Sequence, residues 1–100
     1  MILTALASGS QHGYGIINDV IGITRGRLKL RAGTLYTALA RLRADGLIEI
    51  EREEIVDSRL RRYYRLTAAG SEQLAQEAAR LQATAETALT RLTSSGAARA

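Results

Sequence analysis

Four arginines lie within seven residues in the second half of this 100-residue chain, at Arg59, Arg61, Arg62 and Arg65. A guanidinium is a planar fork of donors that matches phosphate oxygens and the acceptor edge of guanine. The segment therefore favours binding of a nucleic acid. Ion pairing with preceding acids remains an alternative, because four carboxylates are available nearby: Glu49, Glu51, Glu53 and Glu54.

A second set of candidates lies in residues 32–45, where the spacing of apolar residues predicts a helix. Leu35, Leu39 and Leu42 repeat at i, i+4 and i+7 and predict its buried stripe. The opposite face is then small, hydroxylated and free of acids: Thr34, Thr37, Ala40, Arg41 and Ala44. Threonine methyls can contact thymine, and hydroxyls and arginine can reach phosphate or guanine. Tyr36 lies at the stripe's edge, so both packing and a phosphate contact are open to it.

The charge of the chain is concentrated in the same region. Residues 1–24 carry one acid and no Lys or Arg, residues 25–65 carry eleven bases and six acids, and residues 66–100 carry three of each. The net excess of five positive charges in the middle segment is typical of a nucleic-acid-binding face. A solvated basic surface without a partner is the alternative interpretation.

The composition excludes several classes of protein. The chain has no Cys and one His, which excludes thiolate chemistry and a histidine metal site. We find no nucleophile–base pair and no phosphate-binding loop, and expect neither an enzyme nor a cofactor. No apolar run reaches the length of about 18 residues that a membrane span needs. The N-terminus lacks the pattern of a signal peptide, so we expect a cytoplasmic protein.

The first 31 residues predict two helices and a connection. Residues 1–8 form a short apolar helix that ends at Gly9 and Ser10, and residues 13–22 form an amphipathic one. Tyr14, Ile17 and Ile21 are its predicted buried positions. His12 is expected to lie in a loop and to bond locally. Residues 23–30 form a basic connection to the next helix, residues 32–45, which Gly46 ends in a left-handed conformation.

In residues 47–66 the apolar side chains no longer follow the helical period and instead alternate with charged ones. Residues 47–53 alternate apolar and charged side chains and predict a strand, and residues 62–66 predict its partner. A loop at 55–60, with Asp57 and Ser58 as turn residues, joins them. Tyr64 and Leu66 are expected to face the core beside Ile48 and Ile50.

Thr67 is the predicted N-cap of a long helix that reaches about Leu92. Its apolar seam is spaced by four and three residues and alternates large and small side chains: Leu74, Ala78, Leu81, Ala85, Ala88 and Leu92. A helix of this length exceeds what the rest of a small domain can cover. A second copy of the chain is the simplest partner, and packing on its own domain is the alternative.

The order of elements predicts an α+β fold, mainly helical with a small β-hairpin. Three helices followed by a hairpin form a winged helix-turn-helix, in which the third helix enters the major groove and the hairpin contacts the backbone or minor groove. We assign residues 1–66 to this DNA-binding domain, 67–93 to a dimerisation helix and 94–100 to a disordered tail. A winged-helix module that binds another protein, without DNA, is the alternative function.

Three ordered segments resemble the PadR family of bacterial transcriptional regulators: GYGI at 13–16, GTLYTALARLRADGLIE at 33–49 and RRYYRLTAAG at 61–70. The resemblance implies a homodimeric repressor on an inverted-repeat operator of double-stranded DNA. It places Thr34, Tyr36, Thr37 and Arg41 at the recognition surface. It also allows a small-molecule effector of unknown identity. Some relatives stack drugs between tryptophans, which this chain, without Trp or Phe, cannot do.

Overall fold

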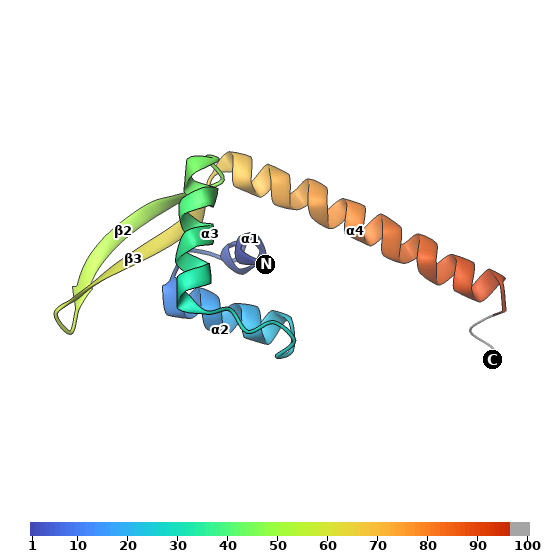
Figure 1. Ribbon diagram of the computed structural model, residues 1–100. Coiled ribbons are helices and arrows are strands. Elements are labelled where there is room, and N and C mark those ends of the chain that lie inside the picture. Colours follow the sequence, from blue (N-terminus) through green and yellow to red (C-terminus); the bar gives the residue numbers. More distant parts are fainter. Residues whose placement is uncertain (97–100) are drawn as a thin grey trace.

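The structure, a computed structural model, describes residues 1–96 (Figure 1). Its elements in order are α1 (Ile2–Leu6), β1 (Gln11–His12), α2 (Gly13–Ile23), α3 (Ala32–Ala44), β2 (Ile48–Val56), β3 (Arg59–Leu66) and α4 (Ala68–Ser94). The three strands form one antiparallel sheet in the order β1-β3-β2. This arrangement confirms the predicted fold class of helices with a small β-hairpin.

Local hydrogen bonds explain where the helices begin and end. The His12 Nδ1 accepts from the Gly15 amide at 3.1 Å and so caps α2, which confirms that it bonds locally, although His12 lies in strand β1 and not in the predicted loop. The Thr67 Oγ1 accepts from the Gly70 amide at 3.0 Å, as the sequence predicts for α4. After α3, Gly46 adopts a φ of +75°, and the Leu47 amide donates back to the Leu42 carbonyl at 3.0 Å, a Schellman motif.

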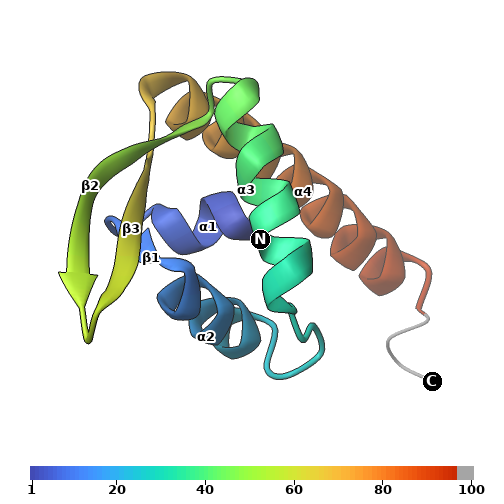
Figure 2. The same cartoon turned by 60° about the vertical axis from the view of Figure 1, so that its left-hand side comes forward.

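The core lies where the three short helices meet the sheet, and in Figure 2 α1 is enclosed by the hairpin, α2 and α3. Its buried residues come from every element of the first 66 residues except β1: Ala5, Leu6, Ile16, Val20, Leu35, Leu39, Ile48 and Tyr64. The predicted stripe of α3 is confirmed for Leu35 and Leu39, with Leu42 half-buried. Tyr64 is 5% exposed, which confirms its place in the core.

The predicted buried face of α2 is wrong for Tyr14 and Ile21, whereas Ile17 is half-buried and packs against the core. Tyr14 is 71% exposed and Ile21 is also exposed, whereas Ile16 and Val20 are fully buried. Apolar residues occupy two overlapping stripes of α2, so helical spacing alone does not choose between them. Burial of Gly13 together with Ile16 and Val20 turns the other stripe inward and leaves Tyr14 on the surface.

The hairpin is longer and its turn tighter than the predicted loop at 55–60. Val56 pairs with Arg59, so only Asp57 and Ser58 form the turn, with φ of +51° and +64°. Positive φ at both positions is the geometry of a type I′ turn, which usually requires Asn-Gly. The predicted turn residues Asp57 and Ser58 are confirmed, but Ser rarely adopts positive φ, although Asp tolerates it, so the sequence suggests a longer loop.

A bulge in β2 changes which side chains share a face. The register shifts between Ile50 and Arg52, which leaves Glu51 as the extra residue. Beyond the bulge, Ile55 pairs with Leu60. Leu60 shares its face of β3 with Tyr64, which lies nearer the core. Strand β1, which the sequence does not predict, pairs with β3 through Gln11 and Tyr64.

Helix α4 extends away from the rest of the molecule (Figure 1), which gives the Cα positions an extent of 60 × 27 × 20 Å. Gly70 lets its first turn approach the Leu47 carbonyl, where a Cβ would collide with backbone. Ser94, predicted to begin the tail, is still helical. Ser95 is the C-cap of α4, and residues 97–100 of the predicted tail lie outside the described residues.

Candidate nucleic-acid interface

The outward face of α3 is exposed as predicted. Thr34, Thr37 and Arg41 are all exposed, and they line a shallow groove of about 490 Å³ together with Gly33 and Ala38. The Thr37 hydroxyl donates to the Gly33 carbonyl at 3.0 Å, so its methyl group is the part left to contact a partner. This face offers a threonine methyl and a guanidinium at neighbouring positions.

Tyr36 lies beside this face and is 53% exposed. Its hydroxyl lies against Gly13 at the start of α2, where an added Cβ would come within 2.7 Å of the oxygen. The missing side chain of Gly13 therefore lets the Tyr36 ring reach across from α3 to α2. The phenol is placed at the surface between the two helices, so both roles left open by the sequence are compatible with its position.

The arginines of the hairpin divide into paired and unpaired groups. Arg62 Nε contacts a Glu53 carboxylate oxygen at 3.0 Å, and Arg65 Nε contacts Glu49 at 2.8 Å. The hydrogen bond and charge of Glu53 raise the pKa of the Arg62 guanidinium above its usual value. Ion pairing, the alternative left open by the sequence, thus applies to these two arginines. The pairs are solvent-exposed, and such pairs contribute little to stability.

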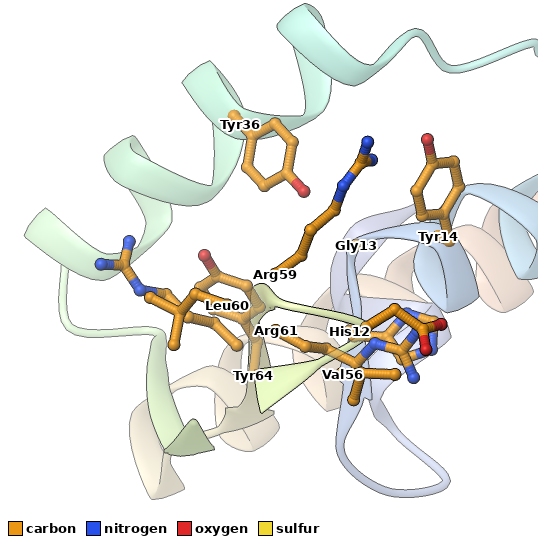
Figure 3. A pocket seen from close by; sticks show the side chains of 11 residues that line it. His12, Gly13, Tyr14, Tyr36, Val56, Arg59, Leu60, Arg61 and Tyr64 are labelled. Atoms are coloured by element: carbon orange, nitrogen blue, oxygen red, sulfur yellow. The ribbon is translucent and has the colours of Figure 1, made fainter. Parts of the chain in front are cut away.

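Arg59 and Arg61 make no ion pair within residues 1–96. Both line a groove of about 780 Å³ that lies between the hairpin, the start of α2 and Tyr36 (Figure 3). Arg62 also lines this groove, although its guanidinium is bound to Glu53. The free positive charge of the hairpin is therefore located near its turn, on the side of α2 and α3.

The sequence pattern indicates a basic connection before α3 but assigns it no contacts. Its four basic residues are all exposed and make no ion pair in the described part of the chain: Arg25, Arg27, Lys29 and Arg31. The Thr24 hydroxyl accepts from the Leu28 amide at 3.1 Å and shapes the connection. The alternation of basic with small or apolar residues is the signal that could have added these side chains to the candidate interface.

The predicted seam of α4 is largely uncovered in the single chain. Leu74 is half-buried, whereas Ala78, Ala85 and Ala88 are exposed and Leu81 is 68% exposed. Leu92 is exposed, and so is Leu89, which the predicted seam does not include although it lies beside Ala85 and Leu92 on the helix. An exposed apolar stripe of this length is a surface that a partner could bury.

Comparison with known proteins identifies the group to which this chain belongs. Residues 2–76 match the "Transcriptional regulator PadR-like family". The chain belongs to the PadR family. A transcriptional regulator of Mycobacterium tuberculosis is 37% identical over 76 residues, which make up 76% of this chain and 67% of that protein.

Solved PadR structures share the architecture. A PadR-like transcription factor of Bacteroides fragilis is 30% identical, with a TM-score of 0.74 over 89% of this chain and 84% of that one. A PadR family regulator of Clostridium difficile is 25% identical, with a TM-score of 0.73 over 91% and 93%. Bacillus subtilis PadR in complex with operator DNA is 25% identical, with a TM-score of 0.67 over 75% and 43%.

These findings establish a PadR-family transcriptional regulator with the winged-helix fold of DNA-binding proteins. The family is one of regulators and not of enzymes. Within residues 1–96, no helix combines the length and the apolar character that crossing a membrane requires.

Proposed function

We propose that this PadR-family protein is a homodimeric repressor that acts in the cytoplasm and binds an inverted-repeat operator. The observation that carries the proposal is the acid-free, exposed face of α3, which presents Thr34, Thr37 and Arg41 beside unpaired arginines of the hairpin. The operator complex of Bacillus subtilis PadR supports DNA as the partner. In this proposal residues 1–66 form the DNA-binding domain and residues 67–93 the dimerisation helix.

In the proposed complex α3 enters the major groove and the hairpin follows the adjacent backbone or minor groove. Arg41 reads guanine or binds phosphate, and the Thr37 methyl contacts thymine. The free cations around α3 bind phosphates, which positions the helix without reading sequence. These contacts assign sequence recognition to α3 and most of the electrostatic attraction to the hairpin and the basic connection.

Dimerisation follows from the uncovered seam of α4. Two copies of the helix would bury Leu81 and Leu92 against each other, which removes apolar surface from water. A twofold axis then relates the two copies of α3, and helix-turn-helix dimers place them about 34 Å apart, in successive major grooves. An inverted repeat is the DNA counterpart of this symmetry.

The first experiment is fluorescence anisotropy of the purified protein with the DNA upstream of its own gene and with a scrambled duplex, over a series of salt concentrations. We expect tight binding to the upstream fragment alone that persists near physiological salt. Equal, weak binding to both duplexes, lost steeply with salt, would contradict recognition of that DNA and favour a protein partner or another operator.

Substitutions on α3 test base contacts directly. Thr37→Ala or Arg41→Ala should cost about 1–3 kcal/mol of binding free energy on the operator. Because the Thr37 hydroxyl is bonded to the helix backbone, Thr37→Val keeps the methyl contact and should retain most of the affinity. Equal losses on scrambled DNA would show that these residues only position the helix.

A further inference from the structure

The groove between the hairpin, α2 and α3 combines phenol and guanidinium groups from three elements. Figure 3 shows the Arg59 side chain extending from β3 into the space between Tyr36 of α3 and Tyr14 of α2. Arg61 lines the same groove from the hairpin. All four side chains end in hydrogen-bond donors, and the two arginines are without ion pairs in the described part of the chain.

Tyr14 is exposed at the start of α2. Its side chain is 71% exposed, and no hydrogen bond to its hydroxyl occurs among the described residues. Its neighbour Gly13 is the residue against which the Tyr36 hydroxyl rests. The start of α2 thus carries one phenol and supports a second, and both line the same groove.

The charges that line the groove favour an anion. Arg59 and Arg61 carry uncompensated positive charge, and Arg62 is bound to Glu53. Asp57 in the turn supplies the one carboxylate among the described lining residues. A phosphate of the DNA backbone is a suitable ligand for these groups, since guanidinium and hydroxyl donors are the usual partners of phosphate oxygens.

We propose that Tyr14, Tyr36, Arg59 and Arg61 form a clamp for the DNA backbone, in which the Tyr14 hydroxyl donates a hydrogen bond to a phosphate oxygen. This inference rests on the proposed function and adds α2 to the DNA-binding surface. Through the clamp, α2, α3 and the hairpin bind the same stretch of the DNA backbone. The clamp therefore sets the position of α3 in the major groove. It carries no sequence information of its own.

Tyr14→Phe tests the clamp, because it removes one hydroxyl from an exposed ring and leaves the fold intact. Operator affinity should fall about tenfold, the effect of one hydrogen bond to a charged acceptor. The loss should be equal on operator and scrambled DNA, and the salt dependence should be unchanged, since a neutral donor displaces no counterion. Tyr63→Phe is the matched control, because that hydroxyl is bonded to Glu54 at 2.6 Å and lies outside the groove.

Neutral methylphosphonates placed one at a time along the operator identify the phosphate. At the clamped position the modification and Tyr14→Phe should be non-additive, because both remove the same hydrogen bond. At all other positions their effects should add. Additive effects at every position, or full affinity of Tyr14→Phe for an operator that wild-type protein binds tightly, would overturn the clamp. Failure of the wild-type protein to bind any operator would contradict the proposed function itself.

Discussion

The first 66 residues and helix α4 differ in how much of their apolar surface the single chain buries. In the DNA-binding domain the core-facing residues of α3 and the sheet, Leu35, Leu39, Ile48 and Tyr64, are buried within the chain, whereas Ile55 and Leu60 near the hairpin turn are exposed. Along α4 only Gly70 is buried, and Leu81, Leu89 and Leu92 are exposed. Both regions have regular apolar spacing, so the difference lies in what covers the apolar face. The core of the first 66 residues is covered within one chain, whereas the apolar face of α4 is left open, and we propose that a second copy of the chain covers it.

The largest expected effect comes from placing a charge in the α4 seam. Leu81→Asp should convert a dimer to monomers, because burying an unpaired carboxylate costs several kcal/mol. Operator affinity should then fall by about 100-fold or more, since two half-sites are no longer bound together. Sedimentation equilibrium and anisotropy measure the two effects.

Ala83→Asp is the control for this variant, because residue 83 lies on the opposite side of α4 from the seam, two positions from Leu81. It should remain dimeric and bind the operator. A Leu81→Asp protein that stays dimeric would show that another surface joins the subunits.

The next effect concerns the difference between buried and exposed positions within the first 66 residues. Leu35→Ala should lower the free energy of unfolding by about 2–5 kcal/mol, because it leaves a cavity in a fully buried site. Leu60→Ala, at an exposed hairpin position, should change it by less than about 0.5 kcal/mol. Urea unfolding monitored by circular dichroism measures both.

A substitution in α4 should affect unfolding in a different way, because its effect should depend on protein concentration. Leu92→Ala should destabilise the protein by an amount that depends on concentration, because in the proposed dimer the second copy buries Leu92. A Leu92→Ala variant as stable as wild type at every concentration would argue against burial of the seam.

The smallest effect concerns how the hairpin binds phosphate. Arg59→Ala with Arg61→Ala should reduce the slope of log affinity against log salt by about 0.9 for each phosphate that these arginines no longer neutralise. Glu53→Ala with Arg62→Ala removes an existing ion pair at constant net charge and should change the slope less. Equal slopes for wild type and the Arg59 and Arg61 double variant would place these arginines away from the backbone.

Much of the fold could be predicted from residue spacing. The stripe of α3, the cap at Thr67 and the left-handed Gly46 are local features, and the structure confirms each of them. The positions of the candidate DNA-binding residues on α3 also followed from helical period. Their roles in binding stay predictions, as does the dimer seam of α4.

The errors occur where local patterns permit two arrangements. Helix α2 has two apolar stripes, and packing against the core selected Ile16 and Val20 over Tyr14. Strand β1 consists of two residues whose pairing with β3 spans about half the chain, so no local signal predicts it. The division of arginines into paired and free groups depends on the register of β2 and β3 and on the bulge between them.

The sequence by itself determined the order of elements, the basic middle segment and the likeness to PadR regulators, because these depend on composition, period and local motifs. Only the tertiary structure decided that Tyr14 is exposed beside Tyr36 and that Arg59 and Arg61 are the unpaired arginines of the hairpin. These features depend on the faces that packing leaves outward and on cross-strand register. Both arise from contacts between residues far apart in the chain.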